Sequence, residues 1–290
     1  MSWWKSLLIW PYLYGTWPVR AWRNRVAAFS GRAPIFVFYY HRIADDAAND
    51  WTVSNEMFQR QVNWLRSRFE MISLSECQRR MQLPVNMQPC AAITFDDGYA
   101  ENCEQALPWL VKERIPCTYF VATDFVINER PFPHDVAMGN RFAPNNVTQL
   151  REMAAAGIDI GAHTRSHADC GKIRDLDALR HEISGSGEVL EQAVGAAIRH
   201  FAFPYGMHNN LSSDAVRVVR EAGYQSFSSA YGGFNLAGDD PFHIQRIGGE
   251  GPLSRLMNWA TVDPLKEFRH RRFEYELEPH PADAREVVAT

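Results

Sequence analysis

The stretch A-A-I-T-F-D-D-G at residues 91–98 joins an apolar run to two adjacent acidic side chains. Five residues without charge predict a short strand that is buried on both faces, as in a parallel sheet. Asp96 and Asp97 follow this strand directly, and Gly98 allows the chain to turn sharply after them. Because active sites of α/β barrels gather at the carboxyl ends of their strands, the stretch predicts an α/β fold with a functional site at this point.

A second strand-like run, residues 158–162, leads into the sequence H-T-R-S-H, which contains His163 and His167. Side chains four residues apart can converge on one ion, either in a turn or in the first turn of a helix. Two imidazoles and one carboxylate bind a divalent metal of the zinc type and leave room for a water and a substrate oxygen. We therefore expect the acidic pair to divide its work, one aspartate binding the metal and the other acting as a general base.

Each motif has an ordinary alternative when taken alone. An Asp-Asp-Gly sequence is often a solvated turn, and two histidines four residues apart are often surface residues. The two segments are more informative together, because both follow buried-type strands in a chain that repeats strand and helix.

The alternation continues along most of the chain. Strands are predicted at 35–40, 117–121, 200–203 and 224–228, and helices at 55–65, 102–113, 148–156, 176–194 and 213–222. Residues 128–144 break the rhythm with three prolines and predict a long loop, in which His134, Asp135 and Arg141 are candidate sugar or lipid contacts.

Three ordered motifs resemble those of the polysaccharide deacetylases, also called the NodB-homology or fourth carbohydrate esterase family. They are T-F-D-D-G-Y at 94–99, H-T-R-S-H at 163–167 and F-A-F-P-Y-G at 201–206. The resemblance extends from about Ile35 to Ala260, with Y-Y-H-R-I at 39–43 and R-I-G at 246–248. It implies a distorted (β/α)7 barrel of the NodB-homology type and metal-dependent removal of acetyl groups from N-acetylated sugars.

The resemblance also implies roles for the first two motifs. Asp97, His163 and His167 are the expected metal ligands, with Zn²⁺ as the first choice and Co²⁺, Ni²⁺ or Fe²⁺ as alternatives. The ion would polarise the acetamide carbonyl and lower the pKa of a water, while Asp96 would take the proton from that water as it attacks.

The third motif is expected to stabilise the oxyanion that this attack produces. A backbone N–H near Tyr205 lies in a turn fixed by Pro204, and a fixed turn can aim an amide at one point. Pro204, Tyr205 and Tyr99 are the predicted substrate contacts. The alternative for this motif is an ordinary turn at the end of a strand.

The chain departs from the family pattern in two places. Where many members have an arginine three residues before the motif tyrosine, this chain has Ala202, and we expect Arg246 to orient Asp96 instead; the alternative is that Arg246 makes a structural salt bridge. The leucine-x-histidine motif that supplies the general acid has no clean copy, which leaves His41 and His243 as candidates.

Composition sets the wider limits. A chain of 290 residues with 46% hydrophobic content can bury one large core, so residues 34–263 are predicted to form one catalytic domain, followed by a charged tail at 264–290. The formal net charge of -4 gives no general attraction to nucleic acid, and we expect no nucleic-acid partner. The five cysteines are odd in number and lack a C-x-x-C pair, so they are predicted to be reduced core residues of a cytoplasmic protein.

Residues 1–33 combine tryptophan, tyrosine and arginine. Pro11 and Gly15 interrupt the apolar part, which is too short to span a bilayer, and the segment lacks the features of a secretory signal. Aromatic side chains beside arginines are typical of a segment in a membrane interface, which would place the protein peripherally at the inner membrane face through residues 1–30. The alternative is a helix that packs on the barrel or caps its lower end.

The predicted function is therefore hydrolysis of the acetamide in a polysaccharide, an oligosaccharide or a lipid-linked sugar precursor. Two alternatives stay open at this point. One is a degenerate barrel that binds glycans or glycolipids without turnover, and the other is a hydrolase of another linear or cyclic amide.

Overall fold

The computed structural model describes residues 3–262 and 272–276. Its main sheet is entirely parallel and follows the order β10-β9-β8-β7-β6-β5-β1-β11, with β4 beside β5. The strands of this sheet are β1 (Ile35–Tyr40), β4 (Glu70–Met71), β5 (Cys90–Phe95), β6 (Cys117–Val121), β7 (Asp159–Ala162), β8 (His200–Ala202), β9 (Ser226–Ser229), β10 (His243–Gln245) and β11 (Ile247–Gly248).

The sheet closes into a barrel through its last strand. β10 and β11 are consecutive halves of one extended segment, separated only by Arg246. The first half pairs with β9, and the second half pairs with β1, where Ile247 lies opposite Phe38. Counted this way, the barrel has seven strands, β1, β5, β6, β7, β8, β9 and the split β10/β11 segment. The predicted distorted (β/α)7 barrel is confirmed, and the distortion lies at Arg246.

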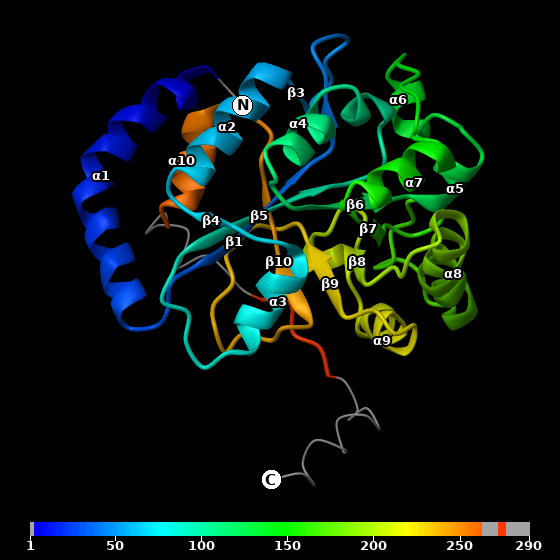
Figure 1. Cartoon of the computed structure of the whole chain (residues 1–290). Helices are drawn as coiled ribbons and strands as arrows, with labels where there is room; N and C mark the ends of the chain where they lie inside the picture. The colour runs from blue at the N-terminus through cyan, green and yellow to red at the C-terminus, as the bar shows by residue number, and fades with distance from the viewer. Residues whose placement is uncertain (1–2, 263–271, 277–290) are drawn as a thin grey trace, which may run out of the picture.

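Helices cover the outside of the barrel (Figure 1). A two-stranded sheet of β2 (Arg42–Ile43) and β3 (Thr52–Val53) lies beyond the carboxyl end of β1. The helices are α1 (Trp3–Phe29), α2 (Asn55–Arg66), α3 (Leu74–Gln82), η1 (Ala100–Cys103), α4 (Ala106–Lys112), α5 (Thr123–Ile127), α6 (Pro133–Ala137), α7 (Val147–Ala155), α8 (Leu176–Val194), η2 (His208–Asn210), α9 (Ser213–Glu221) and α10 (Leu253–Ala260).

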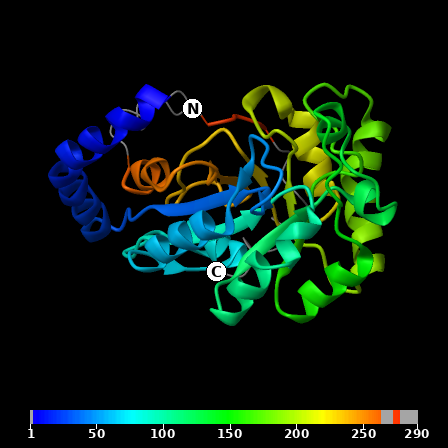
Figure 2. The ribbon, with the colours of Figure 1, turned by 90° about the horizontal axis from the view of Figure 1, so that it is seen from above.

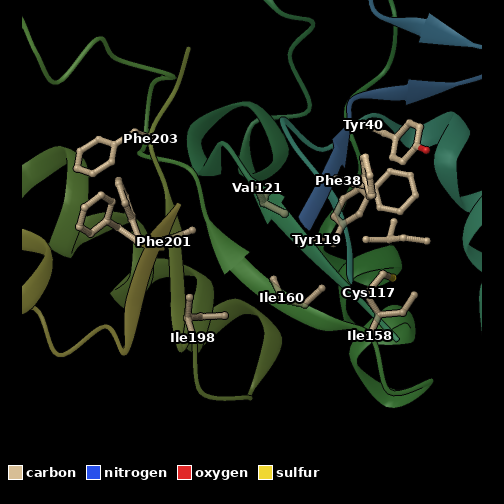
Figure 3. Close-up of a cluster of buried hydrophobic side chains, with 14 of the residues drawn as sticks. Phe38, Tyr40, Cys117, Tyr119, Val121, Ile158, Ile160, Ile198, Phe201 and Phe203 are labelled. Carbon is tan, nitrogen blue, oxygen red and sulfur yellow. The ribbon is translucent and has the colours of Figure 1, made fainter. Parts of the chain in front are cut away.

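The strands are apolar on both faces, as expected for a parallel barrel. Outward side chains, among them Phe38, Tyr119, Ile160 and Phe201, belong to the main core under the helices, part of which Figure 3 shows. Alternate residues fill the barrel interior, where a Cβ atom on Gly161 would lie 2.4 Å from the Phe120 ring. Only glycine fits at that position, so the interior is packed and chemistry is confined to the rim.

Most predicted elements are confirmed within a few residues, and the differences have local causes. The expected helix at 102–113 is divided into η1 and α4, and the expected loop at 128–144 contains the short helix α6. Proline at the first position of α6 supplies the fixed φ with which a helix can begin.

The N-terminal segment forms the 27-residue helix α1, although Pro11 and Pro18 lie within it. The helix is held on the barrel by Arg20, which is buried and donates hydrogen bonds to the Asn258 carbonyl and to the side chains of Asn258 and Thr261 at the end of α10. The alternative that this segment is a helix packed on the barrel is confirmed. Within the described residues, no helix combines the length and the apolar character needed to cross a membrane.

The cysteines and the tail complete the fold. All five cysteines are unpaired, and four of them are buried, as predicted. Of the predicted charged tail, 264–271 and 277–290 lie outside the described residues. Residues 272–276 pack against β9 and β10, where the Tyr275 ring lies 5.5 Å from the Phe227 ring.

Candidate active site with a three-residue metal centre

Asp97, His163 and His167 meet at the carboxyl edge of the barrel. Asp97 follows β5, His163 follows β7, and His167 lies in the turn after it. The Asp97 Oδ1 atom is 3.2 Å from His167 Nε2 and 3.5 Å from His163 Nε2, and the three potential ligand atoms lie within 4.8 Å of one another. The predicted convergence of these three side chains is confirmed.

The backbone around these residues is locally unfavourable. Asp97 has a φ angle of 73°, Thr164 of 61° and His167 of 58°, in the left-handed region that side chains other than glycine rarely adopt. Hydrogen bonds hold these conformations, since the Ala122 N–H donates to the Asp97 carbonyl and the Ala168 N–H to the Thr164 hydroxyl. Such strain is typical of positions where the direction of a side chain matters for function.

The donor set fits a divalent metal. Asp97 is 3% exposed, and its Oδ1 atom has no hydrogen-bond donor among the described residues, although His167 Nε2 lies 3.2 Å away. A buried carboxylate oxygen without a donor is costly unless a cation compensates it. The anionic form is favoured even so: burial acts to raise the pKa of Asp97, but nearby histidines, His167 first, lower it.

His163 presents the nitrogen that a metal needs. Its Nδ1 atom lies 2.7 Å from the Ala202 carbonyl, which can only accept, so Nδ1 carries the proton and Nε2 keeps its lone pair toward Asp97. Burial lowers the pKa of His163 to about 4, which keeps the ring neutral near pH 7. A neutral imidazole fixed by a backbone carbonyl is the usual form of a histidine metal ligand.

The second aspartate, Asp96, is bound by Arg246. The guanidinium is fully buried and donates from two nitrogens to the two oxygens of Asp96, at 2.6 and 2.9 Å, and a further hydrogen bond joins it to Thr94 Oγ1. Burial acts to raise the pKa of Asp96, but Arg246 in the first place, together with His163 and His41, more than offsets this and the pKa is lowered. The expected reach of Arg246 to Asp96 is therefore confirmed, with the small Ala202 side chain in the barrel interior nearby.

His41 lies at the end of β1 and pairs with a residue that the sequence analysis missed. Its Nδ1 atom is 2.7 Å from the Glu250 carboxylate. Burial acts to lower the pKa of His41, but the carboxylates of Glu250, Asp97 and Asp96 together raise it to about 9. The signal for Glu250 was a single acidic residue between glycines, G-G-E-G at 248–251, directly after the last strand.

His243 does not reach the site, and its prediction as a general acid is wrong. Its Nε2 atom is 2.9 Å from Ser229 Oγ, and its ring stacks on Phe227 on the outer side of β9 and β10. Arg246 lies three residues further along the same extended segment, and side chains an odd number of residues apart point to opposite faces of a strand. Burial also lowers the pKa of His243 to about 3, so the ring has no acidic proton to donate near pH 7.

Tyr205 lies beside the metal ligands. Its φ angle is 62°, its side chain is 58% exposed, and its ring centre is 5.0 Å from that of His167. The Tyr205 N–H makes no hydrogen bond to another described residue. Pro204 is buried, and its carbonyl accepts a hydrogen bond from the Gly206 N–H at 2.7 Å, so Pro204 shapes this turn. The prediction that Pro204 is an exposed substrate contact is therefore wrong.

Tyr99 was also predicted as a substrate contact, and the structure corrects this. Its ring is fully buried, and its hydroxyl donates to Asp135 at 2.7 Å and accepts from the Trp51 indole N–H at 3.2 Å. Asp135 is equally buried and is therefore not an exposed sugar contact. His134 of the same loop is one-third exposed, and its ring centre lies 5.9 Å from that of His167. Arg141 is exposed.

Comparisons with known proteins agree with this geometry. A family profile described as "Polysaccharide deacetylase" matches residues 85–227, which include both aspartates, both histidines and Tyr205. A predicted polysaccharide deacetylase of Bacillus subtilis (strain 168), YxkH, is 23% identical over 237 residues, or 81% of this chain and 78% of that protein. The poly-beta-1,6-N-acetyl-D-glucosamine N-deacetylase of Staphylococcus aureus (strain MRSA252) is 25% identical over 64% of this chain and 63% of its own length.

Among solved structures, IcaB from Ammonifex degensii has a TM-score of 0.65 and 21% identity, covering 79% of this chain and 97% of that one. At this identity the structural likeness supports the fold, while the profile match and the motifs support the family. Arg246, His41 and Glu250 lie outside the matched profile, and the barrel brings them to the same rim. Residues 85–227 therefore match the polysaccharide deacetylase family, and the fold of the barrel agrees with that match.

Proposed function

We propose that this chain removes acetyl groups from N-acetylated sugars with a divalent metal, Zn²⁺ in the first place, held by Asp97, His163 and His167. The observation that carries the proposal is the buried Asp97 oxygen that faces two imidazole nitrogens, next to a second carboxylate held by Arg246. When bound, the ion supplies Lewis-acid chemistry to the acetamide carbonyl and to the attacking water.

Asp96 is the proposed general base. Its carboxylate is ionised near pH 7, because Arg246 keeps the pKa low, and each oxygen retains lone-pair capacity beyond the one that Arg246 occupies. The two parallel hydrogen bonds fix the plane of the carboxylate, so its free lone pairs have a defined direction. A base oriented in this way can take a proton from water without first reorganising its surroundings.

The Tyr205 N–H is the proposed donor to the oxyanion. The turn that contains it is fixed by Pro204, and this N–H is available because no described residue accepts from it. A preorganised N–H of this kind is worth about 3 to 4 kcal/mol in other hydrolases. The exposed Tyr205 ring, next to His167, would also give the sugar an aromatic face for contact.

His41 is the proposed general acid. The leaving group is the amine of the sugar, which must gain a proton when the C–N bond breaks. Glu250 holds the imidazole by Nδ1 and favours its protonated form, which leaves the Nε2 proton for the amine. His41 and Asp96 directly follow the adjacent strands β1 and β5, so acid and base come from neighbouring strand ends.

The form of the substrate and the cellular location are part of the proposal. Peptidoglycan, chitin-like oligomers, exopolysaccharides and lipid-linked sugar precursors present the same acetamide. We propose a cytoplasmic protein that is peripheral at the inner membrane face through residues 1–30, where a lipid-linked precursor would be at hand. The reduced cysteines and the aromatic, basic composition of these residues support this location.

A glycan-binding barrel without turnover would not need a ligand set together with an oriented base, which argues against that alternative. The direct test combines metal analysis of the purified protein with acetate release from an N-acetylglucosamine oligomer. We expect about one zinc-type ion per chain and acetate release that stops with a chelator and returns with added Zn²⁺. Bound metal without acetate release would favour the binding barrel or another amide, and no metal at all would exclude the proposed chemistry.

A further inference from the structure

The outer surface of α1 is almost entirely apolar. From Leu8 onward, seven large apolar side chains of this helix are between 38 and 84% exposed, and together they are called the outer face of α1: Leu8, Trp10, Tyr14, Val19, Trp22, Val26 and Phe29. Single exposed apolar residues are common on protein surfaces, whereas seven large ones along one helix indicate an interaction surface.

The opposite face of α1 already has its partner. Leu13 and Arg20 are buried, and Arg20 anchors the helix to Asn258 and Thr261 of α10 and its end. Figures 1 and 2 both place α1 at the edge of the molecule, with α10 between it and the barrel strands. The helix is therefore held in one orientation, with its outer face open to solvent, and Trp22 and Val26 of that face also line a pocket with Pro34 and Phe234 of the barrel.

Basic residues are in excess in the N-terminal part of the chain, which favours an anionic partner. Residues 1–44 contain one lysine, five arginines and no Asp or Glu, although the whole chain has 30 basic and 34 acidic residues. The first 44 residues thus carry six formal positive charges, and the other 246 carry a net charge of -10. Two of the six, Arg20 and Arg42, are buried within the fold. Arg25 and Arg32 are exposed on or beside the C-terminal half of α1. An apolar row that is flanked by cations matches the acyl boundary and the anionic headgroups of a bilayer.

We propose that the outer face of α1 lies in the interface of an anionic membrane, with its tryptophan, tyrosine and phenylalanine side chains at the level of the headgroups. Aromatic side chains favour this depth, because their rings are apolar and their polar atoms remain hydrated. A second copy of this chain is a poorer occupant, since it would bring two basic segments without any Asp or Glu together.

The orientation of the helix leaves the candidate active site uncovered. The carboxyl end of α1 leads into the start of β1, and the helix packs along the side of the barrel, whereas the metal centre lies at the carboxyl ends of the strands. A bilayer against the outer face of α1 thus lies beside the barrel and does not block its rim. The inference deepens the membrane location in the proposed function by naming the surface that makes the contact, and it is independent of the deacetylation chemistry.

Vesicle sedimentation tests the inference. The full chain is incubated with vesicles of phosphatidylcholine alone and with vesicles that also contain 30% phosphatidylglycerol. We expect binding to the anionic vesicles to be about tenfold stronger or more, and to weaken as NaCl rises to about 0.5 M. The Trp22→Ser/Phe29→Ser variant should lose about tenfold of this binding, because two inserted rings are removed. The matched control is Met87→Ser/Val111→Ser, which removes two exposed apolar side chains elsewhere and should bind as the wild type does.

Acetate release from a soluble oligomer without vesicles reports on folding and chemistry separately, and all variants should match the wild type there. Equal binding of the wild type and the Trp22→Ser/Phe29→Ser variant would overturn the inference, as would failure of the wild type to bind anionic vesicles. Light scattering without lipid tests whether a second copy of this chain binds the outer face of α1. A dimer that only the Trp22→Ser/Phe29→Ser variant fails to form would assign this face to a second copy and would also overturn the inference.

Discussion

Arg246 donates hydrogen bonds from two nitrogens to Asp96, at 2.6 and 2.9 Å, across 150 residues of sequence. Arg246 is also the residue at which the last strand divides, its first half pairing with β9 and its second half with β1. One position therefore closes the barrel and orients the proposed base. The small side chain of Ala202 also lies in the barrel interior, and the guanidinium enters from a different strand.

The first prediction concerns this pair. Arg246→Ala removes the cation that lowers the pKa of Asp96, so the carboxylate becomes easier to protonate and the acid limb of the rate-versus-pH profile moves to higher pH. Breaking a buried ion pair should also lower the free energy of unfolding by about 3 to 5 kcal/mol. Arg246→Lys is the control, since it keeps the charge and loses the paired hydrogen bonds. An acid limb that stays in place in a folded Arg246→Ala variant would leave the contact with a structural role only.

The second prediction concerns the metal ligands. His163→Ala and His167→Ala should each lose bound metal and acetate release, while circular dichroism shows an intact fold, because the site lies at the rim and the core lies below it. His181→Ala, an exposed histidine on α8, is the matched control and should keep both metal and activity. Metal content at the wild-type level in both ligand variants would show that the ion binds elsewhere.

The third prediction separates the two aspartates. Asp96→Asn keeps the shape of the side chain and cannot accept a proton in the same way, so it should retain the metal and lose turnover by about a hundredfold to ten-thousandfold. Asp97→Asn should instead weaken metal binding, because its orphaned oxygen is the anionic ligand. The measurement is metal content and kcat for both variants side by side. If Asp96→Asn turns over at nearly the normal rate, the base is not Asp96.

Much of this site follows from local sequence, because a strand that ends in chemistry-bearing residues can be recognised from its apolar run alone. Asp96, Asp97 and His163 are predicted in this way, whereas Arg246 is predicted from the departure at Ala202. The alternation of side chains along a strand also separates His243 from Arg246. With Arg246 pointing inward, His243 three residues earlier had to point outward, as it does.

Contacts between loops could not be predicted from the sequence, for a physical reason. The polar cluster of Trp51, Tyr99 and Asp135 joins three segments whose meeting depends on how the loops pack over the rim. Tyr99 follows the acidic pair by two residues and is predicted to contact substrate. Its hydroxyl instead donates a hydrogen bond to the buried Asp135 carboxylate, and its ring is buried as well. Residues 128–144 show no periodicity that would predict this arrangement.

The last prediction concerns the general acid. His41 remains a candidate for this role, whereas His243 lies outside the site. His41→Ala should lower kcat more than it changes KM, because proton donation to the leaving amine is needed in the transition state and not for binding. Glu250→Gln is the sharper test. Glu250 helps to raise the pKa of His41 to about 9, so without its charge the imidazolium loses its proton at lower pH. The alkaline limb of the rate profile should therefore move to lower pH, toward the ordinary histidine range. His243→Gln is the control for a buried histidine away from the rim and should leave both limbs in place. If Glu250→Gln leaves the alkaline limb unchanged while His41→Ala keeps its turnover, the proton must come from a water or from a group outside this pair.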